Sequence, residues 1–344
     1  MDKQTVTTVF ERAAELKASD VHVAVGCPVL FRIDGVLTPQ TKQLVTPEQA
    51  EEFAQAVLGA EGFKRFQTNR EADASFGLKD ATRLRINCHY ERGNVSIVAR
   101  IVPNAIPTPE ETDLVELVGR IKTERQGLIL FTGPTGAGKS TALATIIEAL
   151  RKDRAVNIIT LEDPIEFVFP AAQGVMRQRE FGDDFLSFPE ALKHVLRQDP
   201  EIVLVGEMRD PETIAAALTL AETGHLIFAT LHTPNAVQTV DRIIDVFPPH
   251  QQSQIRSQLS LSLRMVVAQR LVPKVGGGRI AVREVLVNTP AVGNIIRESR
   301  PQELLSVLQT GETVGMITFE KAAKKLLKEG KITDETFELI KKLA

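Results

Sequence analysis

The run of residues 133–141 has the composition and spacing of a loop that binds phosphate groups, because it matches G-x-x-x-x-G-K-[ST]. The run consists of Gly133, Pro134, Thr135, Gly136, Ala137, Gly138, Lys139, Ser140 and Thr141. Glycines let successive backbone N–H groups turn toward an anion, and a following helix adds its positive N-terminal end. In such a loop Lys139 would reach the β- and γ-phosphates of ATP, and the Ser140 hydroxyl would be a ligand of Mg²⁺. The alternative is a glycine-rich structural turn.

Two carboxylates follow apolar runs that we expect to be strands of the same sheet. Glu162 comes directly after residues 156–161, and Glu207 follows residues 202–205 after one glycine. A carboxylate at such a strand end can hold the water shell of the metal ion beside a phosphate loop. Glu162 and Glu207 are therefore candidate catalytic residues, with Glu207 also a candidate Mg²⁺ ligand, partly through water. The alternative is a helix cap or a loop charge, which we expect of Asp210.

Two histidines flank a further apolar run, residues 226–231. His232 follows this run at its carboxyl end, where it could hydrogen-bond the γ-phosphate; the alternative is a polar loop residue. His225 precedes the run, so it lies at the opposite edge within its own subunit. For His225 we expect a structural or intersubunit role rather than direct chemistry.

Two arginines face each other in a predicted hairpin over residues 82–102, centred on Arg92-Gly93. The register that makes one face wholly apolar also sets Arg85 opposite Arg100 on the polar face. Like charges in directly opposite positions are destabilising, although a solvated face could tolerate them. A more specific explanation is that an anion binds between the two arginines and offsets their repulsion. We therefore predict that both meet nucleotide phosphate when domains or subunits close.

The apolar runs that position these residues indicate a parallel sheet, because strands without polar positions are buried on both faces. Amphipathic helical segments lie between them, as a doubly wound or RecA-like α/β domain requires. Beyond Pro248 we predict helices, interrupted at Gly276-Gly277-Gly278. The predicted strands of this sheet are residues 128–131, 156–161, 202–205 and 226–231.

The first part of the chain predicts mixed helix and strand. A helix over 5–17 is followed by strands over 20–25 and 28–35, the second ending in the turn Asp34-Gly35. Thr46 and the residues after it form a capping box that begins another helix. This part is an α+β domain by its pattern.

Three prolines between Pro103 and Pro109 indicate a stiff linker. A second capping box, at Thr108 to Glu111, predicts the start of the next domain's first helix. We therefore divide the chain into an N-terminal domain, a proline-rich linker and an ATPase domain with C-terminal helices. Their predicted bounds are residues 1–102, 103–112 and 113–344.

The composition excludes several classes of protein. The chain has 344 residues, 43 % hydrophobic and 25 % charged, which is typical of a globular protein of about two domains. A net charge of −3 and 5 % aromatic residues argue against a nucleic-acid partner. Cys27 and Cys88 are too few for a zinc tetrad and suggest a reducing compartment. No apolar run approaches the roughly 20 residues of a membrane span, and the N-terminus is polar. We expect a cytoplasmic protein without direct membrane insertion.

Several motifs occurring in order resemble those of the secretion ATPases of type II secretion and type IV pili. They are Ala18-Ser19-Asp20-Val21-His22, Arg32-Ile33-Asp34-Gly35, the phosphate loop, Glu162-Asp163-Pro164-Ile165-Glu166, Val205-Gly206-Glu207-Met208-Arg209-Asp210 and Thr223-Gly224-His225 through Leu231-His232-Thr233. The lack of a cysteine tetrad, together with Gly276-Gly277-Gly278-Arg279 and Asn288-Thr289-Pro290-Ala291, most resembles the pilus retraction ATPases of the PilT type.

The resemblance implies a PAS-like N-terminal domain, a RecA-like ATPase domain and a homo-hexameric ring with ATP at the domain interface. It also implies an inner-membrane pilus platform protein as partner, which would hold the ring at the inner face of the cytoplasmic membrane. In this family Glu162 would activate the attacking water and Glu207 would handle Mg²⁺. The two histidines match the family's His box, and the paired arginines match its arginine fingers.

This chain departs from the family in two places. Ala291-Val292-Gly293 replaces the usual Ala-Ile-Arg of retraction enzymes, and Pro200-Glu201 replaces Pro-Asp. Gly206 stands where the usual Walker B pattern has an aspartate. Three alternatives therefore stay open. They are a pilus-extension, secretion or DNA-uptake ATPase of the same superfamily, a RecA-like nucleic-acid motor, and a nucleotide-binding subunit without turnover.

Overall fold

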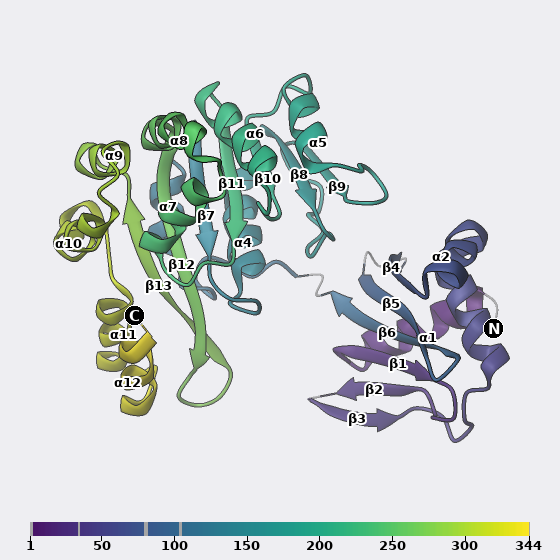
Figure 1. The fold of residues 1–344 in the computed structure, drawn as a ribbon. Coiled ribbons are helices and arrows are strands. Elements are labelled where there is room, and N and C mark those ends of the chain that lie inside the picture. The colour runs from purple at the N-terminus through teal and green to yellow at the C-terminus, as the bar shows by residue number, and fades with distance from the viewer. Residues whose placement is uncertain (1–2, 34, 79–81, 103–104, 344) are drawn as a thin grey trace. The chain divides into compact units, whose positions relative to one another are not determined.

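The computed structural model describes residues 3–33, 35–78, 82–102 and 105–343. The predicted turn at Asp34 and the first residues of the predicted linker, 103 and 104, lie outside the described residues. The chain forms two compact units (Figure 1). One comprises Met1–Ala105 with Glu166–Val168, and the other Ile106–Ile165 with Phe169–Ala344.

The first unit is an antiparallel sheet with two helices packed on it. Its strands lie in the order β3-β2-β1-β6-β5-β4. Phe10 of the first helix packs edge-on against Phe53 of the second and Phe76 of a strand, with ring centroids 5.5 and 5.3 Å apart. The elements are α1 (Lys3–Glu15), β1 (Asp20–Ala24), β2 (Leu30–Ile33), β3 (Val36–Pro39), α2 (Pro47–Asn69), β4 (Glu71–Gly77), β5 (Arg83–Glu91) and β6 (Asn94–Val102).

Two local predictions for this unit are confirmed. Thr46 caps α2 with both bonds of a capping box. The β5–β6 hairpin has the expected register, with Arg85 opposite Arg100 and Cys88 opposite Ile97. The apolar face of the hairpin is buried in the core of the unit.

The second unit contains a sheet in the order β13-β12-β7-β11-β10-β8-β9. The four strands predicted from their apolar runs are neighbours and run parallel. The strands are β7 (Gly127–Thr132), β8 (Val156–Glu162), β9 (Gly174–Glu180), β10 (Ile202–Val205), β11 (Leu226–Leu231), β12 (Leu263–Pro273) and β13 (Arg279–Val287). The helices are α3 (Val115–Ile121), α4 (Lys139–Asp153), α5 (Phe188–Val195), α6 (Pro211–Glu222), α7 (Ala236–Asp245), α8 (Pro249–Ser262), α9 (Pro290–Arg297), α10 (Leu304–Thr310), α11 (Phe319–Lys328) and α12 (Asp334–Leu343).

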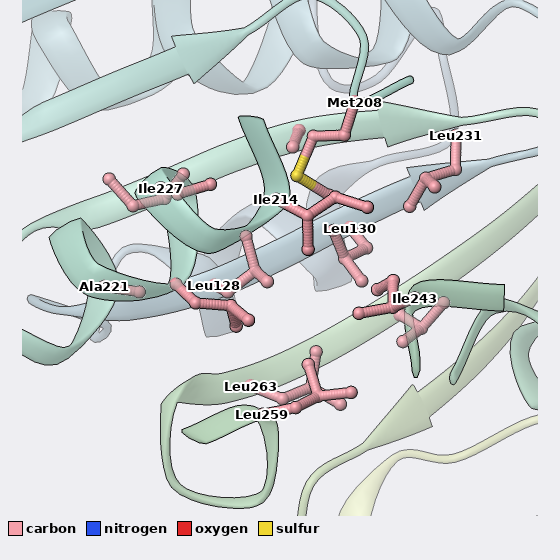
Figure 2. Close-up of a cluster of buried hydrophobic side chains, with 14 of the residues drawn as sticks. Leu128, Leu130, Met208, Ile214, Ala221, Ile227, Leu231, Ile243, Leu259 and Leu263 are labelled. Carbon is pink, nitrogen blue, oxygen red and sulfur yellow. The ribbon is translucent and has the colours of Figure 1, made fainter. Parts of the chain in front are cut away.

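Helices cover both faces of this sheet, which explains why its central strands have no polar face. Leu128 and Leu130 of β7 belong to the core that contains Ile214 of α6 and Leu259 of α8 (Figure 2). The intervening β7 residues belong to the opposite core, which is completed by α3 and α4. The fold is therefore the expected doubly wound arrangement.

The prediction of helices throughout the region beyond Pro248 is wrong. After α8 the chain forms the antiparallel hairpin β12–β13, whose turn carries the three glycines. β12 extends the sheet beside β7, so it is nearly buried on both faces. The apolar run within β12, residues 265–268, is too short for its periodicity to distinguish a buried strand from a buried helical segment. Strand β9, which is polar, was also not predicted.

The second capping box forms without the helix it was expected to begin. The Thr108 amide donates to Glu111 at 2.7 Å, and the Glu111 amide donates to the Thr108 hydroxyl at 3.3 Å. The backbone then turns, with Asp113 in the left-handed region at φ 54°, and α3 begins only at Val115. A left-handed residue cannot continue a right-handed helix.

Within the residues that the structure describes, no helix has both the length and the hydrophobicity needed to cross a membrane.

Candidate nucleotide-binding site

The phosphate loop connects the end of β7 to the start of α4. Gly136 and Gly138 adopt left-handed conformations, with φ of 78° and 83°. A Cβ atom on Gly133 would lie 2.2 Å from the carbonyl oxygen of Gln269. These glycines are therefore required both by the backbone conformation and by the close approach of β12.

The helix that follows the loop has no side-chain cap at its N-terminus. Gly138 is the N-cap of α4 and provides no side-chain hydrogen bond to the first N–H groups of the helix. Lys139 is 8 % exposed, and its ammonium donates to the carbonyl oxygens of Gly133 at 2.7 Å and Pro134 at 3.3 Å. Ser140 lies in the first turn of α4. The loop and the first turn of α4 thus combine backbone amides, the Lys139 ammonium and the Ser140 hydroxyl, the groups that bind phosphate.

Glu162 is the last residue of β8 and is held in one orientation. Its side chain is buried, and its Oε1 accepts hydrogen bonds from Thr160 at 2.6 Å and from Gln178 at 3.3 Å. Gln178 belongs to β9, so a strand missing from the prediction supplies one of these donors. A carboxylate fixed in this way is suited to accept a proton from a water molecule in a defined direction.

Gly206, which stands where the usual Walker B pattern has an aspartate, lies against the backbone of Glu162. Its amide donates to Leu161 at 2.8 Å, and a Cβ atom here would lie 3.2 Å from the Glu162 Cα. Glu207 follows directly in the chain. The absence of a side chain at Gly206 lets the ends of β8 and β10 approach closely.

Glu207 contacts two basic side chains. Its Oε2 accepts from Arg209 at 2.8 Å, and its Oε1 lies 3.1 Å from His232 Nε2. An ionised carboxylate can only accept hydrogen bonds, so His232 Nε2 carries the proton in this contact. Glu207 and His232 follow adjacent strands, which explains how they meet.

The carboxyl ends of β7, β8, β10 and β11 lie at one edge of the sheet because the strands are parallel. The phosphate loop, Glu207 and His232 follow these ends, and Glu162 is the last residue of β8. His225 precedes β11, about 23 Å from His232 at roughly 3.3 Å per residue. Its Nδ1 lies 3.1 Å from the carbonyl oxygen of Leu220 at the end of α6. The structure therefore brings His232 to this edge and leaves His225 at the other.

Arg85 and Arg100 belong to the first unit, and each has an acidic partner there. Arg85 Nη1 lies 3.4 Å from Glu166 Oε1, and Arg100 contacts Asp20. Arg100 Nε donates to Asp20 Oδ1 at 2.8 Å, and Arg32 Nε lies 3.5 Å from Asp20 Oδ2. Burial opposes ionisation of Asp20, but hydrogen bonds from Arg100 and Ser19 outweigh it and keep the pKa of Asp20 below its usual value. Asp20 had no predicted role, since its partner is distant in the chain.

The comparisons with known proteins agree with this arrangement. Residues 3–277 match the family described as "Type II/IV secretion system protein". The "Type IV pilus retractation ATPase PilT" of Pseudomonas aeruginosa is 41 % identical over 330 residues, covering 96 % of each chain. The "Twitching motility protein" of Neisseria gonorrhoeae is 41 % identical over 310 residues, covering 90 % of this chain and 83 % of that protein.

A solved structure shows the same fold. The crystal structure of the pilus retraction motor PilT with bound ADP superposes with a TM-score of 0.90 at 40 % identity, covering 97 % of this chain and 96 % of that one. The predicted fold class is thus confirmed, as is the resemblance to retraction ATPases of the PilT type. The chain belongs to the family of type II/IV secretion system proteins.

Proposed function

We propose that this chain hydrolyses ATP and that a ring of its copies uses the energy to power type IV pilus retraction, the basis of twitching motility. The observation that carries this proposal is the meeting of the phosphate loop, Glu162 and Glu207 at one edge of the second unit's sheet. The proposal is supported by the 41 % identity, over nearly the whole chain, to a pilus retraction ATPase.

ATP would lie with its phosphates on the backbone amides of the loop and at the N-terminus of α4. Lys139 would neutralise the β- and γ-phosphates. Glu162 would accept a proton from the attacking water, since its carboxylate already has a fixed direction.

Mg²⁺ fits the oxygen donors at this edge. Among the residues the structure describes there is no group of three or more His, Cys, Asp or Glu side chains that could hold a metal ion. The Ser140 hydroxyl and, through water, the Glu207 carboxylate would hold Mg²⁺ together with phosphate oxygens, which are the donors this ion prefers. Bound there, Mg²⁺ would neutralise charge that develops on the phosphates. His232 would link Glu207 to the γ-phosphate.

Arg85 and Arg100 would act as arginine fingers on nucleotide held by the phosphate loop when domains or subunits close. The ring would be a homo-hexamer, and rotation of the domains across residues 103–112 would follow ATP binding and release. Its partner would be the inner-membrane pilus platform protein, at the inner face of the cytoplasmic membrane. A nucleic-acid partner is not expected at a net charge of −3.

The decisive experiment is an ATPase assay on the purified protein with Mg²⁺. Wild type should release phosphate, and Lys139→Ala should abolish turnover. Lys324→Ala, an exposed lysine of α11, is the matched control and should retain it. Turnover that survives in Lys139→Ala would refute the assignment of the site.

Deletion of the gene separates retraction from the alternative of extension. Cells without a retraction motor keep their pili and become hyperpiliated, whereas cells without an extension motor are bald. Bald cells would overturn the retraction proposal and leave ATP hydrolysis standing.

A further inference from the structure

The carbonyl of Ala137 in the phosphate loop is held by a side chain from β12. Gln269 is 1 % exposed, and its Nε2 donates to the Ala137 oxygen at 2.7 Å. In a planar trans peptide the C=O and the N–H of the next residue point in opposite directions. The bond from Gln269 to Ala137 therefore also fixes the direction of the Gly138 N–H, at the N-cap of α4.

The other end of the Gln269 amide is held as well. Its Oε1 accepts from Arg283 Nε at 2.7 Å, and Arg283 is its register partner on β13. Burial lowers the pKa of Arg283 to about 10, so the guanidinium is still protonated at neutral pH. With one end donating and the other accepting, the amide has a single orientation that satisfies both neighbours.

Arg283 extends this chain of hydrogen bonds to the first segment of the second unit, residues 106–114. Its Nη2 donates to the carbonyl oxygen of Thr112 at 2.9 Å, and its Nη1 donates to that of Asp113 at 3.0 Å. A further bond joins this segment to α4, since Thr145 donates to the carbonyl oxygen of Pro107 at 3.0 Å.

We propose that Gln269 and Arg283 are positioning residues that couple segment 106–114 to the phosphate loop. Nucleotide on the loop favours the orientation of the Ala137–Gly138 peptide in which Gln269 is bonded. A bonded Gln269 holds Arg283 on the carbonyls of the segment. Because linkage is reciprocal, the segment in its bonded position strengthens nucleotide binding by the same factor. This inference rests on the proposed binding of nucleotide to the loop.

Hydrogen–deuterium exchange on the full-length protein, with and without ADP and Mg²⁺, tests the coupling. In wild type, ADP should slow exchange both in the loop, 133–141, and in segment 106–114. Arg283→Lys keeps the charge but loses the fork that grips two carbonyls. In this variant ADP should still protect the loop and should no longer protect the segment. Arg279→Lys, an exposed change on the same strand, is the control and should behave as wild type.

A second variant removes the hydrogen bond between Gln269 and Ala137, at the other end of this series of hydrogen bonds. Gln269→Glu keeps the size of the side chain and the acceptor for Arg283 but lacks the donor to Ala137. The Kd for ADP should rise about tenfold, equivalent to about 1.4 kcal/mol. Thermal unfolding of the variant should still show a cooperative transition, which establishes that the protein is folded. A purely structural role would lower the melting temperature and leave this Kd unchanged.

The outcomes separate this inference from the proposed function. Protection of the loop without protection of segment 106–114 in wild type would overturn the coupling and leave nucleotide binding intact. Segment protection that persists in Arg283→Lys would overturn it too. If ADP protects neither region, nucleotide binding itself fails. If Gln269→Glu does not fold, wild type and Arg283→Lys still decide the question.

Discussion

Glu207 and His232 follow adjacent parallel strands and lie in contact, with His232 Nε2 3.1 Å from Glu207 Oε1. The contact requires the proton on Nε2, so the orientation of the imidazole depends on the carboxylate. Glu207, the proposed metal-handling group, is therefore hydrogen-bonded to His232, the proposed phosphate-contacting group.

We predict that these two residues are energetically coupled in turnover. Glu207→Gln should raise the Mg²⁺ concentration needed for half-maximal activity, and His232→Ala should lower kcat. Effects of residues in contact are not additive, so a double-mutant cycle on kcat/KM should give a coupling of about 0.5–3 kcal/mol. Additivity within about 0.5 kcal/mol would show that the contact has no part in catalysis.

Glu162→Gln should reduce kcat by about 10² to 10⁴, the range typical of a lost general base. Affinity for ATP should change only a few-fold, because the substitution preserves the size of a side chain that does not bind phosphate. Single-turnover kinetics and equilibrium binding measure the two quantities. Glu320→Gln, at the exposed start of α11, is the control. Unchanged turnover in Glu162→Gln would exclude Glu162 as the base.

Replacement of either paired arginine should lower turnover far more than nucleotide binding. For Arg85→Ala and Arg100→Ala we expect losses of kcat on the order of 10³, as for other arginine fingers. Their stabilities should differ, since Arg100 donates to the buried Asp20 at 2.8 Å, whereas Arg85 meets the more exposed Glu166 at 3.4 Å. Thermal unfolding should thus show a larger fall in melting temperature for Arg100→Ala than for Arg85→Ala. A wild-type maximal rate in both variants would contradict the prediction.

The lowered pKa of Asp20 predicts a pH-dependent contribution to stability. Since the pKa is lower in the folded state, this contribution is complete above the unfolded value of about 3.9 and is lost as the pH falls through the folded value. Asp20→Asn should therefore cost about 1–3 kcal/mol at pH 7, and the difference from wild type should shrink below about pH 4.

Urea unfolding of the wild-type and Asp20→Asn proteins between pH 3 and 7 measures this difference. Asp183→Asn, an exposed loop substitution, is the control. A difference independent of pH over this range would show that ionised Asp20 does not stabilise the unit.

The two cysteines should react very differently with a thiol reagent. Cys27 is exposed, whereas Cys88 is buried, and burial, with a smaller effect of Asp73, raises the pKa of the Cys88 thiol to about 12. Because the thiolate is the reactive form, one thiol per chain should react rapidly at pH 8 and the second only on unfolding. Cys27→Ser should remove the rapid phase. Rapid reaction in Cys27→Ser would contradict the buried position of Cys88.

Much of the site was predictable from the sequence because it depends on local patterns. The phosphate loop is a contiguous motif, Glu162 ends β8, and Glu207 follows β10 after one glycine. Both strands are largely apolar, and their parallel pairing brings their ends to one edge. The pairing of Arg85 with Arg100 was also predictable, because a hairpin turn and one apolar face determine the register.

The tertiary structure decided which distant residues support that site. Gln178 reaches Glu162 only because β9 joins the edge of the sheet, and Gln269 reaches Ala137 only because β12 lies beside β7. Asp20 meets Arg100 for the same reason, through the pairing of β1 with β6. A strand's neighbours in a sheet are chosen by the packing of the whole core, and this choice leaves no periodic signal in the strand's own residues.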